Sequence, residues 1–244
     1  MERATYDRMA EIDADHWWFV ARRRIVAAAI ARLGLSARAR ILEVGCGTGS
    51  NLAMLQRFGR VDALEPDAGA RALASRRGGF AVTGGLLPDA AAAFEDGAYD
   101  LIVMLDVLEH IPDDRAALAS LLPKLAPGGR LLLTVPANPW MWSAHDAAHH
   151  HQRRYTPRTL RAVLADGRFA ARRLTHFNSL LFPLIAAARA LGKLTGKEGG
   201  DDAMPPAPVN RLLGAVFAAE RHIAVRGSLP FGVSLLAVAE PAIR

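Results

Sequence analysis

The feature that most constrains the fold is a regular alternation of strand-like and helix-like segments over residues 41–136. Short runs that are apolar throughout, such as YDLIVMLD at 99–106, are followed by helical patterns such as DDRAALASLLPKLA at 113–126. Strands that are apolar on both sides are typical of parallel sheets covered by helices on both faces. The alternation therefore predicts a doubly wound α/β fold with a mostly parallel sheet.

After residue 136 the pattern loosens. FAARRLTHF at 169–177 and PFGVSLLAVAEP at 230–241 are predicted to be a sixth and a seventh strand, with two helical stretches between them. With 244 residues the chain is long enough for one α/β domain and short for two. We expect one domain, 1–244, which consists of an N-terminal helical cap (1–40), a core (41–177), a helical insertion (178–227) with a mobile loop (194–208), and a last strand (228–244).

The formal charge of +6 raises the possibility of a nucleic-acid partner. The densest basic region is 153–173, where Asp166 is the one acidic residue. We expect most of its arginines to form a solvated face, because charge runs usually do and because no aromatic stacking platforms are interleaved with them. No nucleic-acid partner is therefore predicted. The arginines are Arg153, Arg154, Arg158, Arg161, Arg168, Arg172 and Arg173.

Cellular location is indicated by features that the sequence lacks. Cys46 is the one cysteine, which excludes a disulfide framework and fits a reducing compartment. No secretory signal is evident, and no stretch reaches the roughly 18 uncharged apolar residues of a membrane-spanning helix. We expect a cytoplasmic protein.

A glycine-rich loop, ILEVGCGTGS at 41–50, follows the first predicted strand. Glycine permits φ > 0 and lets a ligand lie against the backbone, and a loop before a helix directs free N–H groups at that ligand. A phosphate-binding P-loop is excluded because no lysine follows the glycines, and the dinucleotide pattern meets Ser50 or Leu52 where it requires glycine. The remaining pattern is E-x-G-x-G-x-G, formed by Glu43, Gly45, Gly47 and Gly49.

Three further motifs follow in order. Glu65 ends the second predicted strand, where an acidic residue of a doubly wound sheet can bind ribose hydroxyls. LDVLEHIP at 105–112 ends the fourth strand, and the K-L-x-P-G-G turn at 124–129 precedes the fifth. Together with HWWF at 16–19, these motifs resemble those of class I S-adenosylmethionine-dependent methyltransferases over residues 16–177, in particular enzymes of the type 11 and type 12 kind that act on small or lipid-like molecules.

The resemblance implies that S-adenosyl-L-methionine is the cofactor. Its methionine portion is expected at the glycine loop and Asp106, its ribose at the end of the second strand, and its adenine near residues 84–86. That turn lacks the Asp or Asn of many relatives, so backbone groups and apolar packing are expected to hold the adenine. The predicted cofactor-binding residues are Glu43, Gly45, Cys46, Gly47, Gly49, Glu65, Pro66, Gly85, Leu86 and Asp106.

A histidine is the first candidate for a general base, because it titrates nearest neutral pH. His145 ranks first, since its loop at 140–157 is expected to close over the acceptor, with Asp146 or Tyr155 nearby to orient it. His151 and His110 are the other candidates. A carbon or thiol acceptor that needs no protein base is the alternative.

Asp106, Glu109 and His110 resemble the E-x-x-E-H motif with which ubiquinone-pathway O-methyltransferases bind a divalent cation. The other interpretation is that Glu109 caps the following helix and that His110 packs under the cofactor. We predict no metal ion.

The absence of an N-P-P-Y type motif after the fourth strand argues against a base-methylating enzyme. We expect the acceptor to be an oxygen, carbon or other nucleophile of a small or lipid-like molecule. The rival hypotheses are a cofactor-binding regulatory protein without catalysis and an RNA methyltransferase.

Two apolar surfaces in the helical insertion allow two interpretations. They either close the core, or they wall a greasy acceptor pocket or rest on a membrane surface. One contains Leu180, Leu181, Leu184, Ile185 and Leu191, and the other contains Val209, Leu212, Leu213, Val216, Phe217 and Ile223.

Overall fold

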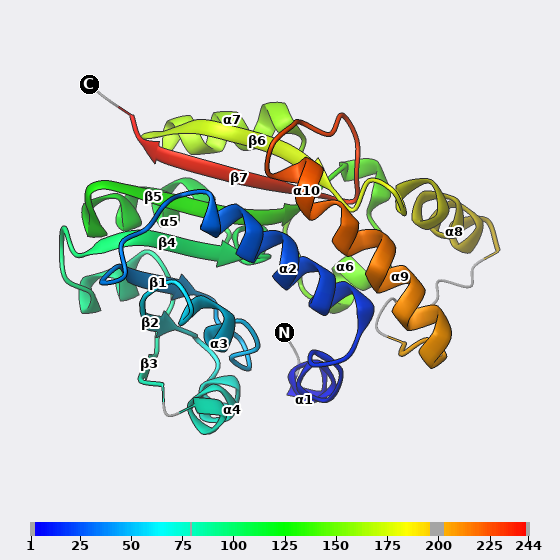
Figure 1. Cartoon of the computed structure of the whole chain (residues 1–244), viewed down its shortest axis with the longest axis horizontal. Coiled ribbons are helices and arrows are strands. Elements are labelled where there is room, and N and C mark those ends of the chain that lie inside the picture. Colours follow the sequence, from blue (N-terminus) through cyan, green and yellow to red (C-terminus); the bar gives the residue numbers. More distant parts are fainter. Residues whose placement is uncertain (1–2, 79, 196–202, 243–244) are drawn as a thin grey trace.

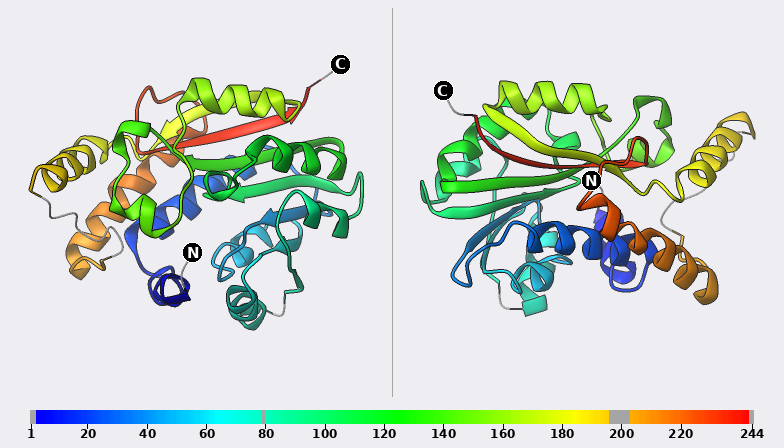
Figure 2. Two further views of the ribbon diagram at one scale, coloured as in Figure 1. Left: turned by 180° about the vertical axis from the view of Figure 1, so that it is seen from behind. Right: turned by 45° about the horizontal axis from the view of Figure 1, so that its top comes forward.

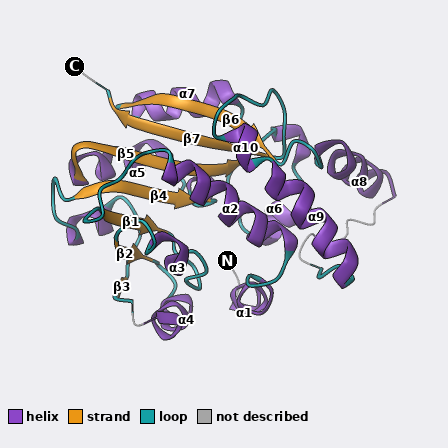
Figure 3. Ribbon diagram, in the orientation of Figure 1, coloured by secondary structure: helices purple, strands orange, loops and turns teal. Residues whose placement is uncertain are grey.

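The computed structural model describes residues 3–78, 80–195 and 203–242. Within these residues a seven-stranded sheet forms the centre of the molecule, as Figures 1 and 3 show. Its strands are β1 (Arg40–Val44), β2 (Arg60–Leu64), β3 (Val82–Thr83), β4 (Tyr99–Leu105), β5 (Leu125–Pro136), β6 (Phe169–Phe177) and β7 (Ser234–Pro241). The α-helices are α1 (Arg3–Ile12), α2 (Trp17–Ala31), α3 (Leu52–Leu55), α4 (Ala68–Gly78), α5 (Asp114–Leu121), α6 (Ala144–Ala148), α7 (Pro157–Asp166), α8 (Phe182–Thr195), α9 (Ala207–Ala219) and α10 (Arg221–Ala224).

The strand order is β3-β2-β1-β4-β5-β7-β6. Neighbouring strands from β3 to β5 pair in parallel, whereas β7 lies antiparallel between β5 and β6. The predicted doubly wound, mostly parallel sheet of seven strands is confirmed. The order reverses between β1 and β4, and ligands of such sheets bind at the carboxyl ends of the strands beside that reversal.

Helices cover both faces of the sheet. Successive residues of each strand point to opposite faces, so each strand packs against both layers of helices. In β4, Ile102 and Met104 belong to the core beneath α5 and α7, whereas Leu101 and Val103 belong to the core beneath α2 and α9. Figure 1 shows α2 and α9 across one face, and the left view of Figure 2 shows α5 and α7 on the other. This alternation explains why the strands are apolar throughout.

The alternation in the sequence also predicts helices at 50–58 and 86–94, and both are shorter in the structure. The helix expected at 50–58 is reduced to α3, and Asn51 at its start donates its side chain to Glu43 and does not cap the helix. The helix expected at 86–94 is a 3-10 helix, Asp89–Ala93. Such tight helices seldom exceed one turn because their hydrogen-bond geometry is poor.

The basic region at 153–173 contributes to internal contacts as well as to the surface. Arg154 is buried against Asp146, and Arg173 donates to the main-chain carbonyls of Ala224 and Gly227. Arg154 is an exception to the solvated face expected of most of these arginines, because an acidic partner lies eight residues before it.

The helical cap and the helical insertion each contribute helices to one face of the sheet, through α2, α9 and α10. Figures 1 and 2 show α8 and α9 projecting at one end of the molecule. The central part of the loop expected to be mobile, 196–202, lies outside the described residues. Among the helices that are described, none has the length and apolar character needed to cross a membrane.

Candidate active site

A cavity of about 530 Å³ opens at the carboxyl ends of β1, β2 and β4. This volume lies in the usual range for small-molecule sites. Its wall includes ten of the residues predicted from the sequence, whereas Glu43, Gly49 and Gly85 are absent from it. The ten are Gly45, Cys46, Gly47, Glu65, Pro66, Leu86, Asp106, His110, His145 and His151.

The glycine loop joins β1 to α3 along the cavity. Gly45 has φ +71°, and a Cβ atom there would stand 2.4 Å from the side chain of Val107. Gly47 has φ +54°, and no atom lies within 4 Å of the place where its Cβ would be. Gly45 is therefore required for close packing, and Gly47 presents bare backbone to the cavity.

Glu65 stands at the end of β2 and braces this loop. Its carboxylate accepts hydrogen bonds from the N–H of Gly47 at 2.8 Å and of Asp67 at 3.0 Å. The hydroxyl of Tyr6 in α1 donates to the same carboxylate at 3.3 Å. Burial raises the pKa of Glu65. The carboxylate is held at the cavity wall, within the lining where ribose hydroxyls were predicted to bind.

Glu43 and Cys46 lie deeper than their motif suggests. Glu43 is fully buried beneath the loop, and one of its oxygens accepts from Asn51 at 2.9 Å. Its other oxygen has no hydrogen-bond partner among the described residues, and burial raises its pKa to about 8. Cys46 packs with Leu52, and burial raises the pKa of its thiol, which makes a reactive thiolate unfavourable. A contact of Glu43 with the cofactor stays a prediction.

An ion pair lines the wall of the cavity beside the glycine loop. Asp106, at φ +56° directly after β4, binds Nη1 of Arg22 in α2. The Arg22 guanidinium is buried and lies 4.6 Å over the ring of Trp18. A cation and an anion side by side match the carboxylate and ammonium groups of an amino acid. Sequence reasoning missed Arg22, although it follows the HWWF motif closely.

A second, smaller cavity of about 160 Å³ adjoins the first and shares Pro66 and Leu86 with it. Its wall is largely apolar and includes Leu64, Gly85 and Ile111. This slot suits a flat, weakly polar ring. Gly85, which is absent from the main cavity, lines this slot, and adenine binding there stays a prediction.

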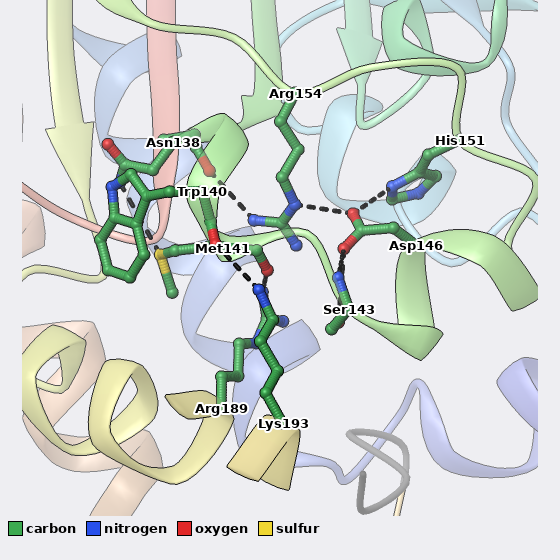
Figure 4. Close-up of polar contacts among 10 residues, drawn as sticks. Asn138, Trp140, Met141, Ser143, Asp146, His151, Arg154, Arg189 and Lys193 are labelled. Carbon is green, nitrogen blue, oxygen red and sulfur yellow. Dashed lines mark hydrogen bonds and ion pairs between the residues drawn. The ribbon is translucent and has the colours of Figure 1, made fainter. Parts of the chain in front are cut away.

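The opposite side of the main cavity is built from the segment after β5 (Figure 4). Asp146, which is fully buried, lies 2.8 Å from Nδ1 of His151 and accepts from Nε of Arg154 at 2.7 Å. Burial alone would raise the pKa of Asp146, but the bonds from His151 and Arg154 hold it well below its usual value. The carboxylate therefore remains ionised and fixes the orientation of the His151 ring.

Tyr155 has a different role from the one expected. Its side chain is buried in the core beneath α5 and α7, and its hydroxyl donates to Asp114 at 2.9 Å. It is not part of the cavity wall and cannot orient a histidine there.

His110 and Glu109 lie beneath His151. The rings of His110 and His151 are 4.7 Å apart, and burial together with His151 and His149 lowers the pKa of His110 to about 3. Glu109 is fully buried, and neither of its oxygens has a hydrogen-bond partner among the described residues. Burial and the charge of Asp106 raise the pKa of Glu109 well above its usual value.

The structure alters the set of potential cation ligands. Glu109, His110 and His151 each offer a ligand atom within 4.8 Å of the others, whereas Asp106 is paired with Arg22. The alternative role of Glu109 as a helix cap is wrong, because Asp113 caps α5 by accepting from Ala116. The absence of a metal ion stays a prediction.

These features fit S-adenosylmethionine. The Arg22–Asp106 pair matches its amino-acid end, the bare backbone at Gly47 leaves room beside it, and Glu65 can accept from ribose hydroxyls. The slot behind Leu86 suits its adenine ring.

Curated relatives are similar to part of this chain. Trans-aconitate 2-methyltransferases of Azoarcus sp. (strain BH72) and Methylobacterium radiotolerans are 31% and 32% identical over 58% and 62% of this chain, and over 54% and 53% of their own length. The ubiquinone biosynthesis O-methyltransferase of Sodalis glossinidius is 30% identical over 48% of this chain and 50% of its own. The chain thus spans about half the length of these relatives.

Solved structures share the fold. A putative methyltransferase in complex with the Haloferax volcanii Trm112 methyltransferase activator is 17% identical, with a TM-score of 0.63 over 99% of this chain and 96% of that one. The geranyl diphosphate C-methyltransferase of Streptomyces coelicolor is 15% identical, with a TM-score of 0.58 over 88% and 77%. The family profile of the methyltransferase domain matches residues 18–179, which is more than half of the chain. With its sheet and cofactor cavity, the chain belongs to the class I S-adenosylmethionine-dependent methyltransferases.

Proposed function

We propose that this chain transfers a methyl group from S-adenosylmethionine to a hydroxyl oxygen of a small molecule. The observation that carries the proposal is the hydrogen bond between Asp146 and His151 in the wall of the cavity. The cofactor supplies a methyl group activated by its sulfonium. A hydroxyl acceptor must also lose its proton, and a base held in place accelerates such a step about 10²–10⁴-fold.

His151 is the proposed base. Asp146 holds Nδ1 of the His151 ring, which leaves Nε2 to receive the proton of the acceptor. His110 is a poor base, because a group with a pKa of about 3 binds a proton too weakly near neutral pH. His145 borders the same cavity, with its ring 6.2 Å from that of His151, and is proposed to contact the acceptor.

The cofactor is proposed to be oriented by charge at one end and by apolar packing at the other. Arg22 binds its carboxylate and Asp106 its ammonium group, and Glu65 accepts from the ribose. Gly47 allows close approach. These residues act by alignment, which can supply about 7–11 kcal/mol in favourable systems.

The acceptor region combines aromatic and cationic side chains. Trp17 and Ile185 provide apolar area, whereas Arg189 provides positive charge. This combination suits a small molecule with an apolar portion and an anionic group. The name of one relative, a ubiquinone biosynthesis O-methyltransferase, supports transfer to oxygen. A cytoplasmic location is part of the proposal.

The test is incubation of the protein with methyl-labelled cofactor and a panel of hydroxyl-bearing acceptors, followed by mass spectrometry. We expect S-adenosylhomocysteine to form together with a product that carries a methyl ether. Glu65→Ala, in which cofactor binding is weakened, is the control for background transfer. A product labelled on carbon would contradict the choice of oxygen.

The rival is a cofactor-binding protein without catalysis. If the protein binds S-adenosylhomocysteine but forms none from the labelled cofactor with any acceptor or metabolite extract, the rival is favoured. The ordered Asp146–His151–Arg154 network argues against it, because cofactor binding alone does not require an ionised carboxylate on the acceptor side.

A further inference from the structure

Asn178 stands directly after β6 in a strained backbone conformation. Its φ of +55° is one that residues other than glycine rarely adopt, although asparagine tolerates it better than most. Asp106 and Asn138, beyond the ends of β4 and β5, have φ of +56° and +61°. Residues in such conformations cluster at ligand sites. The side chains of Asp106 and Asn138 are bound by Arg22 and by the main-chain carbonyl of Gly232, and Asn178 differs from both.

The side-chain amide of Asn178 is buried without a hydrogen bond. The residue is fully buried, and neither Nδ2 nor Oδ1 has a hydrogen-bond partner among the described residues. Burying polar groups in this way is unfavourable, and most buried amides are therefore paired. The amide of Asn178 offers a ligand both a donor, Nδ2, and an acceptor, Oδ1.

The main chain of Asn178 is engaged by other residues. The carboxylate of Glu220, which is fully buried directly after α9, accepts from the main-chain N–H groups of residues 178–180. The carbonyl of Asn178 accepts from the N–H of Val233 at 3.3 Å. Because both main-chain groups are occupied, the side-chain amide is the polar group with which Asn178 borders the main cavity.

This part of the cavity wall lies away from the glycine loop. Ser234, another residue of the wall, pairs with Pro136 at the end of β5 and with Phe177 at the end of β6. In the strand order, β5 and β7 separate β6 from β4, the strand after which Asp106 stands. At a spacing of about 4.8 Å between neighbouring strands, β4 and β6 are about 14 Å apart. Asn178 is therefore placed to meet a part of the acceptor remote from the cofactor.

We propose that the side-chain amide of Asn178 binds an amide edge of the acceptor, as a primary carboxamide or a ring lactam presents it. Such a group offers an acceptor and a donor side by side, and so satisfies Nδ2 and Oδ1 together. A carboxylate would face Oδ1 with a second acceptor, and a single hydroxyl cannot meet both atoms in good geometry. The inference rests on the proposed function, because it takes this part of the cavity as the place of the acceptor.

The experiment is an NMR titration of the full chain in the presence of S-adenosylhomocysteine. The chain contains four asparagines, so protein isotopically labelled on the nitrogen atoms of asparagine alone gives four side-chain amide signals. The probe is δ-valerolactam, a ring lactam, and N-methyl-δ-valerolactam, which lacks the N–H, is the matched control. We expect δ-valerolactam to shift the Asn178 signal saturably. The N-methyl compound should bind at least about tenfold more weakly, because it leaves Oδ1 unpaired.

A variant with a matched control tests the role of the amide. Asn178→Gly permits the positive φ and removes the amide, so it should weaken δ-valerolactam binding by at least about tenfold. Arg168→Gly is the same exchange at an exposed residue with φ +66° at the opposite end of β6, and it should leave the affinity unchanged. Circular dichroism establishes that each variant folds. If Asn178→Gly does not fold, the titration of the wild type decides.

Three results overturn the inference. The Asn178 signal does not shift at any concentration up to the solubility limit of δ-valerolactam, or the N-methyl compound binds equally well, or Asn178→Gly binds δ-valerolactam as the wild type does. The third result together with a lowered Tm assigns the amide to the stability of the fold alone. Probe binding requires no methyl transfer, so the inference stands or falls separately from the formation of a methyl ether.

Discussion

The two sides of the cavity are built in different ways. On the cofactor side, Gly45 and Gly47 shape the backbone after β1, and Glu65 braces it from the adjacent β2. On the acceptor side, function depends on side chains such as His151, which Asp146 holds in place. Changes on the first side should therefore impair cofactor binding, and changes on the second should impair transfer while binding persists.

The largest effect is expected on the acceptor side. His151→Ala should lower the single-turnover rate of methyl transfer about 10²–10⁴-fold, because the acceptor loses its base. Calorimetry should show unchanged affinity for S-adenosylhomocysteine. His222→Ala, an exposed histidine of α10 outside the cavity wall, is the control. A rate within a few-fold of wild type would remove His151 from catalysis.

The next effect concerns the amino-acid end of the cofactor. Arg22→Leu should weaken S-adenosylhomocysteine binding about 10–100-fold, because it removes charge-assisted hydrogen bonds worth about 1.5–3 kcal/mol. Methylthioadenosine, which lacks the amino acid, should bind Arg22→Leu as it binds the wild type. Arg24→Leu, on the exposed side of α2, is the control. Equal losses for both ligands would place Arg22 elsewhere.

Glu65→Ala should weaken cofactor binding by at least about tenfold. In contrast to Arg22→Leu, it should also weaken methylthioadenosine binding, because that ligand retains the ribose. Glu95→Ala, an exposed residue paired with Arg40, serves as the control. Unchanged calorimetric affinities would exclude Glu65 from the ribose site.

The last effect concerns the stability of the fold beneath the glycine loop and leaves the two sides of the cavity unchanged. Glu43 has a pKa of about 8 in the folded chain, against about 4.3 when unfolded. Between these values the unfolded chain releases a proton that the folded chain keeps, so the free energy of unfolding falls by up to about 1.4 kcal/mol per pH unit. Glu43→Gln removes this dependence.

This pH dependence of the free energy of unfolding is measured by urea unfolding of the wild type and of Glu43→Gln at several pH values. The stability of the wild type relative to the variant should decline from about pH 4.5 to pH 8 and be level on either side. Other carboxyls with raised pKa, such as Glu109, contribute equally to both chains and cancel. Parallel curves would show that Glu43 ionises normally.

Much of the fold could be predicted because its signals are local. Apolar runs such as that of β4 indicated strands buried on both faces, and the glycine spacing indicated the loop after β1. The lengths of α3 and of the 3-10 helix Asp89–Ala93 could not be predicted. They depend on the tertiary surroundings of the residues at their starts, Asn51 and Pro88, neither of which caps its helix with a side chain. The insertion of β7 between β5 and β6 also depends on distant pairing.

By itself the sequence determined the alternation of strands and helices, the glycine loop after β1 and the place of Glu65 at the end of β2. Backbone freedom and periodicity are properties of neighbouring residues, which is why these features could be predicted. Tertiary structure alone decided which charges meet. Arg22 reaches Asp106 across 84 positions, and Asp146 holds His151, which the sequence ranked behind His145. It also decided that Leu184 and Leu191 of α8 face outward, whereas Ile185 of the same helix packs against the core. Such pairings depend on side-chain geometry in three dimensions, which no local pattern records.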